Sequence, residues 1–205
     1  MRSSCNQSCR RACIFCASSN GNSDLFNREA EILGRSLASS GWGLVYGGAN
    51  VGLMGAVANA ALAVDGEVIG VIPEALVSRE IAHPGLTELH IVKSMHERKA
   101  LMASLADAFI ALPGGYGTLD EFLEILTWAQ LRIHQKPCVL INLDGYYDQL
   151  IAFLDHAVNR GFLKPEYRLM MQVVRSAGEA LSLIQKQVDI STSSTPPGGD
   201  SELIQ

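Results

Sequence analysis

The residues best suited to chemistry form a glycine-rich loop, Pro113-Gly114-Gly115-Tyr116-Gly117-Thr118, directly after the apolar run 108–112. Its three glycines leave backbone amides free to approach one anion, and Thr118 adds a hydroxyl group. A helix predicted to follow the loop would direct the positive end of its dipole at the same point. The loop lacks the Gly-Lys-Ser/Thr ending of triphosphate-binding loops. The pattern therefore predicts a site for a phosphate monoester.

Arg98 is a charged residue on a face that the sequence predicts to be buried. Met95, Met102 and Leu105 repeat at helical spacing after Ser94, and Arg98 falls on the same stripe. An inward-facing arginine needs an anionic partner, which favours contact with a phosphate or a carboxylate. The alternative is that its aliphatic stem lies along the edge of the core while the guanidinium reaches water.

Glu121 has two interpretations. Thr118 and Glu121 have the spacing of a capping box, in which the carboxylate only closes the first turn of a helix. The same spacing recurs at 94–97 and at 176–179. Glu121, however, directly follows an anion-binding loop, where a carboxylate could contact ribose hydroxyls or stabilise a cationic transition state. The pattern supports the cap and the catalyst equally.

Two other segments lie between a predicted strand and a predicted helix. Residues 17–22 are small and polar, and residues 47–55 contain four glycines. Both could approach a ligand. Both are equally typical of ordinary turns and of close packing between a helix and a sheet.

Short apolar runs alternate with helical patterns, which predicts one α/β domain of Rossmann-like type with a mainly parallel sheet and helices on both faces. The expected strands are 12–17, 44–46, 68–72, 89–92, 108–112, 138–142 and 171–174. The expected helices are 24–40, 52–64, 94–106, 118–133, 147–160 and 177–187. Such sheets bind ligands beyond the carboxyl ends of their strands, which is where the glycine loop is predicted to lie.

Length and charge narrow the function classes. A chain of 205 residues with 48% hydrophobic content fits one domain, expected over 11–190 between flexible ends at 1–10 and 191–205. A net charge of −5 gives no basic field for nucleic acid or a membrane surface. No apolar run approaches the roughly 20 residues of a membrane span. The polar N-terminus has no apolar signal core, so we expect a cytoplasmic protein.

Five cysteines without an export signal argue against a disulfide framework. Cys13 and Cys16 fall in an apolar run, where a free cysteine packs as a small hydrophobic residue. This favours structural cysteines over a zinc site, although Cys5 and Cys9 lie nearby in the sequence. We expect neither a metal nor a cofactor.

Residues 113–121, together with Met95-His96-Glu97-Arg98-Lys99, closely resemble the LONELY GUY family of cytokinin riboside 5′-monophosphate phosphoribohydrolases, often mislabelled lysine decarboxylases. The resemblance runs from about Cys13 to Val174 and includes 46–48, 52–55 and 127–131. It implies hydrolysis of the N-glycosidic bond of an N6-substituted adenosine 5′-monophosphate. The products would be a free cytokinin base and ribose 5-phosphate.

The resemblance also implies that Arg98 and Glu121 are the catalytic pair, which decides the role of Glu121 in favour of chemistry. Asp120 stands where plant members commonly have Glu, a conservative difference. Members are usually dimeric, so a homodimer with residues 118–133 near the interface is expected. The implied substrate contacts are Glu80, Arg98, Lys99, Gly114, Gly115, Tyr116, Gly117, Thr118, Leu119, Asp120, Glu121 and Thr127.

Two alternatives remain open. One is a general AMP phosphoribohydrolase, and the other is a non-catalytic carrier of molybdenum cofactor or nucleotide with the same fold. The joint presence of Arg98 and Glu121 favours catalysis, because a carrier needs no such pair. Lysine decarboxylation is disfavoured, because no motif for pyridoxal phosphate accompanies Lys93, Lys99 or Lys136.

Overall fold

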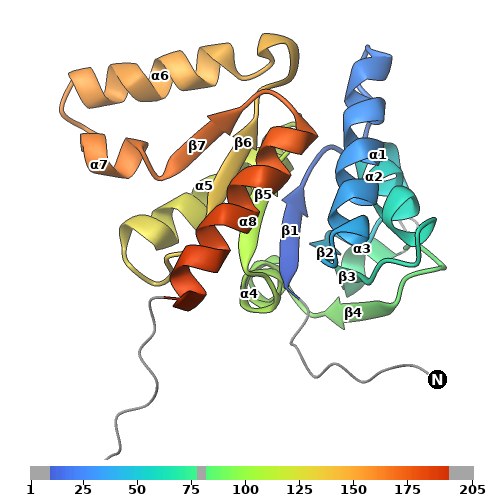
Figure 1. Ribbon diagram of the computed structural model, residues 1–205. Coiled ribbons are helices and arrows are strands. Elements are labelled where there is room, and N and C mark those ends of the chain that lie inside the picture. Colours follow the sequence, from blue (N-terminus) through green and yellow to red (C-terminus); the bar gives the residue numbers. More distant parts are fainter. Residues whose placement is uncertain (1–9, 78–81, 194–205) are drawn as a thin grey trace, which may run out of the picture.

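Seven parallel strands form one sheet in the computed structural model, which describes residues 10–77 and 82–193 (Figure 1). Their order is β4-β3-β2-β1-β5-β6-β7. All the predicted strands are present, with ends that differ by at most two residues, which confirms the α/β class and the parallel sheet. The strands are β1 (Arg11–Phe15), β2 (Gly43–Tyr46), β3 (Val68–Pro73), β4 (Glu88–Val92), β5 (Ala108–Ala111), β6 (Cys138–Ile141) and β7 (Met171–Val174).

The inner strands are apolar because helices cover both of their faces. Every residue of β2, β3, β5 and β6 is buried, whereas the edge strand β4 has no buried residue. Continuous apolar runs of this kind are typical of parallel sheets enclosed on both sides. Cys13 is buried in β1 and Cys16 just after it, and both are free thiols, as predicted.

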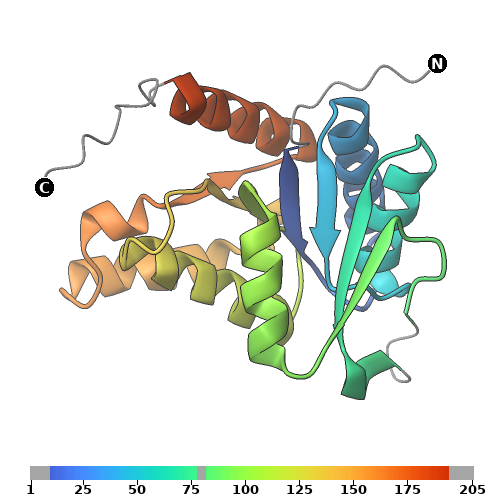
Figure 2. The same ribbon diagram turned by 90° about the horizontal axis from the view of Figure 1, so that it is seen from below.

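Helices α1 (Asp24–Ser39), α2 (Gly52–Leu62) and α8 (Ala177–Ser193) pack on one face of the sheet. Helices α4 (Met95–Leu105), α5 (Tyr116–Gln130) and α6 (Asp148–Asn159) pack on the other face. Figure 2 shows the two layers on either side of the strands. The predicted helices on both faces are therefore confirmed. Three short helices, α3 (Glu74–Val77), η1 (Leu143–Gly145) and α7 (Pro165–Arg168), were not predicted, because they are too short to show an apolar period.

The strand order reverses between β1 and β5. From β1 the chain adds β2, β3 and β4 toward one edge of the sheet. From β5 it adds β6 and β7 toward the opposite edge. Backbone hydrogen bonds join the two loops that leave these strands, from Leu112 N–H to Phe15 O at 2.9 Å and from Ala17 N–H to Pro113 O at 3.2 Å. Such a reversal opens a crevice beyond the strand ends. The glycine loop lies at this crevice.

Helix α8 continues to Ser193, beyond the predicted end at 187. The expected flexible ends lie mostly outside the described residues, so the boundaries of 11–190 stay predictions. No helix in the two described ranges combines the length and the apolar character that crossing a membrane requires.

Candidate active site

A pocket of about 350 Å³ lies at the crevice between the loop after β1, helix α4 and the start of α5. It brings together Arg98, Glu121 and the second half of the glycine loop, as the sequence predicted. The loop after β1 also contributes, which the sequence had left open. The lining residues are Cys16, Ala17, Ser18, Ser19, Met54, Leu76, Met95, Arg98, Gly115, Tyr116, Gly117, Thr118 and Glu121.

Helix α5 begins two residues earlier than predicted, and this removes the capping-box interpretation of Glu121. Gly115 is the N-cap residue, and the start of the helix has no side-chain cap hydrogen bond. Thr118 therefore lies inside the first turn and cannot form a capping box with Glu121. By contrast, the boxes predicted at 94–97 and 176–179 are present, with each Ser hydroxyl accepting from the Glu amide at 3.1 and 3.3 Å. A helix start without a side-chain cap can bind an anion through its amides.

Gly114 is required because Thr118 packs directly against it. A Cβ atom at Gly114 would lie 2.0 Å from the Thr118 hydroxyl oxygen, and Thr118 is only 3% exposed. At Gly115 and Gly117 a Cβ atom would meet no other atom within 4 Å. Gly114 thus serves close packing, whereas Gly115 and Gly117 border open space in the pocket.

Arg98 is buried at 5% exposure, so its guanidinium does not reach water past the edge of the core. Its contacts are long: Nη2 donates to Gly47 O at 3.4 Å, and Nη1 lies 3.8 Å from the sulfur of Met95. Its Nε is buried without a partner. A guanidinium carries five N–H donors. Arg98 therefore keeps unused donors at the pocket, as a ligand-binding arginine requires.

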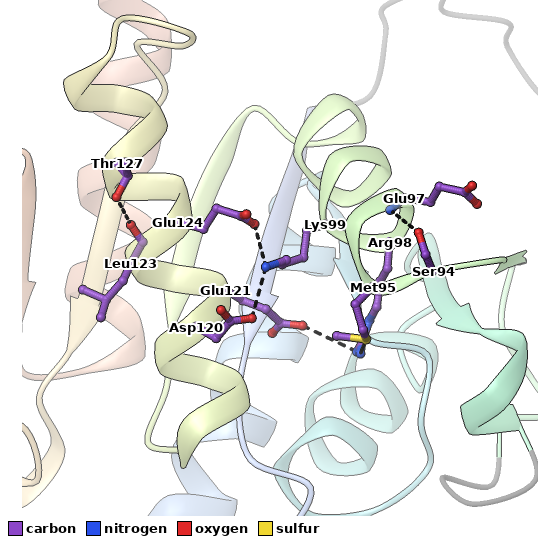
Figure 3. A network of polar contacts seen from close by, with 10 residues as sticks. All are labelled: Ser94, Met95, Glu97, Arg98, Lys99, Asp120, Glu121, Leu123, Glu124 and Thr127. Carbon is purple, nitrogen blue, oxygen red and sulfur yellow. Dashed lines mark hydrogen bonds and ion pairs between the residues drawn. The ribbon is translucent and has the colours of Figure 1, made fainter.

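Glu121 lies opposite Arg98, across the space between α5 and α4 (Figure 3). The carboxylate Oε1 is 3.7 Å from Arg98 Nη2, and Glu121 is 8% exposed. Cys16 lines the same pocket. Burial, and secondly the charge of Glu121, raise the pKa of Cys16 well above its usual range. The thiol is therefore protonated and is a poor nucleophile.

Lys99 and Asp120 lie beside the pocket and pair with each other. Lys99 Nζ is 3.1 Å from both Asp120 Oδ2 and Glu124 Oε2, which links α4 to α5 (Figure 3). Burial alone would lower the pKa of Lys99, but its hydrogen bonds to Glu124 and Asp120 outweigh burial and raise that pKa. Neither Lys99 nor Asp120 is part of the pocket lining.

Three other described residues implied as substrate contacts, Gly114, Leu119 and Thr127, do not line this pocket. Thr127 donates to Leu123 O at 2.8 Å and borders a separate groove of about 290 Å³ between α5, α6 and α7. Leu119 is partly buried and packs against the hydrophobic core on the α5 side of the sheet. Glu80 lies outside the described residues.

Two tyrosines next to the glycine loop were missed by the sequence reasoning. Tyr146 donates to Gly114 O and Tyr147 donates to Leu112 O, each at 2.8 Å. Both follow β6, so the rule that functional residues come after strand ends could have found them.

The comparisons with known proteins agree on one family. Residues 54–184 match the family described as "Possible lysine decarboxylase". A cytokinin riboside 5′-monophosphate phosphoribohydrolase of Rhodococcoides fascians is 51% identical over 173 residues, covering 84% of this chain and 87% of the relative. An enzyme of the same name from Arabidopsis thaliana is 49% identical over 177 residues, covering 86% of this chain and 81% of the relative.

Solved structures resemble this fold at lower identity. The molybdenum cofactor carrier protein of Chlamydomonas reinhardtii superposes with a TM-score of 0.66 at 19% identity, covering 88% of this chain and 98% of that one. The molybdenum cofactor binding protein of Rippkaea orientalis gives 0.66 at 22% identity, covering 87% and 97%. At these identities the likeness shows the fold alone. The identities near one half over most of the sequence decide the family: the chain belongs to the LONELY GUY family of cytokinin riboside 5′-monophosphate phosphoribohydrolases.

Proposed function

We infer that this protein hydrolyses the N-glycosidic bond of N6-substituted adenosine 5′-monophosphates, giving a free cytokinin base and ribose 5-phosphate. The observation that carries this proposal is the buried pair of Arg98 and Glu121 in a pocket at the amino end of α5. The relatives that are about half identical bear the name of this activity.

The phosphate fits at the amino end of α5. The amides that follow Gly115 have no side-chain cap, and the helix dipole favours an anion there. Glu121 is five residues beyond Tyr116, about 7.5 Å further along the helix axis. A ribose bound through its 5′-phosphate can span that distance. Its C1′ atom would then lie close to the carboxylate of Glu121 and to Arg98.

In the reaction, the bond between C1′ and the base nitrogen breaks, and its electron pair leaves with the base. Positive charge develops on the ribose, and the carboxylate of Glu121 stabilises it and orients the attacking water. The water oxygen bonds to C1′ and releases one proton to solvent, which balances the proton that the departing base takes up. Arg98 holds the ribose or phosphate and does not donate a proton, because a guanidinium has a pKa above about 12. Asp120 is outside the pocket lining, which favours a water as the proton donor to the base.

The test is product analysis. Purified protein is incubated with isopentenyladenosine monophosphate or with AMP, and free base is separated by chromatography. We expect base release from both, and faster release from the isopentenyl compound. Equal rates would support the general AMP phosphoribohydrolase instead. No release together with tight binding of a pterin phosphate would support the carrier.

The enzyme acts as a homodimer in this proposal. Large apolar side chains are exposed just after α5, on and after α6, and just after α7. Neighbouring exposed apolar side chains can form an association site. Light scattering should give twice the chain mass, and Phe162→Asp should give the monomer, while Ile32→Asp on α1 should leave the dimer intact. The exposed apolar residues proposed for the dimer interface are Leu131, Ile133, Phe153, Phe162 and Leu169.

We place the enzyme in the cytoplasm, with nucleotides and not nucleic acid as its partners. Cys13, Cys16 and Cys138 are buried free thiols, which are typical of reducing compartments. The net charge of −5 disfavours nucleic acid.

A further inference from the structure

Three successive carbonyl groups where β5 runs into the glycine loop accept hydrogen bonds from other parts of the protein. Tyr147 Oη donates to Leu112 O at 2.8 Å, and Tyr146 Oη donates to Gly114 O at 2.8 Å. Between them, Pro113 O accepts from Ala17 N–H at 3.2 Å. The partial negative charge of a carbonyl oxygen repels a phosphate. Here the carbonyl oxygens before α5 are hydrogen-bonded to protein groups.

The bond from Tyr146 also fixes an amide. In a planar trans peptide, the carbonyl of one residue and the N–H of the next point in opposite directions. A Gly114 carbonyl held by Tyr146 therefore turns the Gly115 N–H to the other side. Tyr146 borders a neighbouring pocket of about 220 Å³, and Gly115 borders both that pocket and the Arg98 pocket. Because glycine rotates freely, nothing intrinsic to Gly114-Gly115 would keep this peptide from flipping.

Tyr147 is held by burial, whereas Tyr146 is 47% exposed and is held by ring contacts. Tyr147 is 3% exposed, and its N–H donates to Asn142 Oδ1 at 2.8 Å. The rings of Tyr146 and Tyr147 meet edge to face at 4.8 Å, and Phe26 packs against Tyr146 at 6.0 Å. The turn before them adopts left-handed backbone at Asp144, with φ of 49°. Asp accepts this conformation more readily than most side chains, so the residue suits the turn.

We propose that Tyr146 and Tyr147 are positioning residues that orient the glycine loop for the substrate phosphate. They act through the carbonyls of Leu112 and Gly114 and do not touch the reacting atoms. The identity of the ligand as a 5′-phosphorylated ribose rests on the proposed function. The hydrogen bonds that Tyr146 and Tyr147 make to the loop do not depend on the proposed function.

The test uses Tyr146→Phe and Tyr147→Phe, which remove only the hydroxyls. Titration calorimetry measures the Kd of ribose 5-phosphate, and steady-state assays measure kcat and KM for the nucleotide. Loss of one such hydrogen bond should raise Kd and KM about three- to tenfold. The kcat at saturating nucleotide should change less than about twofold, because Arg98 and Glu121 are untouched. Tyr167→Phe on α7 is the matched control and should behave as wild type.

A wild-type Kd in both variants would overturn the proposal. So would a fall in kcat with unchanged Kd and KM, because that would place the hydroxyls in the chemical step. A thermal unfolding scan of each variant separates loss of folded protein from loss of affinity. The titration requires no turnover, so absent base release from every nucleotide would refute the hydrolase while the Kd values still decide the role of the tyrosines.

Discussion

Arg98 Nη2 and Glu121 Oε1 lie 3.7 Å apart, each on a residue less than a tenth exposed. The distance is too long for a direct hydrogen bond and short enough for strong attraction between the charges. A ligand hydroxyl or a water molecule could contact both groups at once. The pair therefore combines a cation for an anionic substrate with a carboxylate for a cationic transition state.

Glu121→Gln should abolish most activity while preserving nucleotide binding. The amide keeps the shape of the side chain but cannot stabilise positive charge on the ribose, so we expect kcat to fall by about 100-fold or more. The Kd of AMP, measured by titration calorimetry, should change less than about threefold. Glu31→Gln on the exposed side of α1 is the control. A nearly wild-type kcat for Glu121→Gln would mean that the carboxylate has no part in catalysis.

Arg98→Lys should weaken both binding and turnover although the charge is kept. A lysine has no planar fork of donors and cannot reproduce the guanidinium contacts. Loss of charge-assisted hydrogen bonds should lower kcat/KM and raise the Kd of ribose 5-phosphate, each by about 10- to 100-fold. Arg35→Lys on the surface of α1 should leave both unchanged. If Arg98→Lys lowered kcat alone, Arg98 would not be a binding group.

Lys99 and Asp120 should contribute more to stability than to substrate affinity. Their ion pair ties α4 to α5 beside Arg98 and Glu121, outside the pocket lining. Lys99→Met and Asp120→Asn should each lower the free energy of unfolding by about 1 kcal/mol or less, and together by less than the sum. Denaturant unfolding measures this. A tenfold rise in the Kd of AMP for Lys99→Met, with unchanged stability, would instead support the substrate contact that the resemblance implied.

Much of the site could be predicted because its signals are local. A strand followed by a glycine loop and a helix is a continuous pattern, and the position of Arg98 follows from helical spacing. The start of α5 could not be predicted from the Thr-x-x-Glu spacing. This spacing fits a helix that begins at Thr118, and it fits equally well inside a helix whose N-cap is Gly115. The bonds from Tyr146 and Tyr147 depend on tertiary packing across β5 and β6, which no local pattern encodes.

Acid pH should destabilise the fold through His83. This side chain is 7% exposed, its Nδ1 accepts from Gly85 N–H at 3.1 Å, and its Nε2 lies 3.0 Å from Asn59 Oδ1. The imidazole is therefore neutral, with its proton on Nε2. Burial lowers the pKa of His83 below its ordinary value of 6.5. Protonating Nδ1 would place a second N–H donor against the Gly85 N–H, and the hydrogen bond between them would be lost.

The sign of the effect follows from proton uptake. Below pH 6.5, the unfolded chain protonates its histidine while folded His83 stays neutral, so the unfolded state binds more protons. The free energy of unfolding should therefore fall as the pH drops below 6.5. The fall should end once the pH is below the lowered pKa of folded His83. Thermal unfolding at about pH 7.5 and about pH 5.5 measures this. His83→Asn should reduce the fall, with the remainder due partly to His134, whose pKa burial also lowers. His156→Asn on the surface should keep the full wild-type fall, and an equal fall in the His83 variant would contradict the prediction.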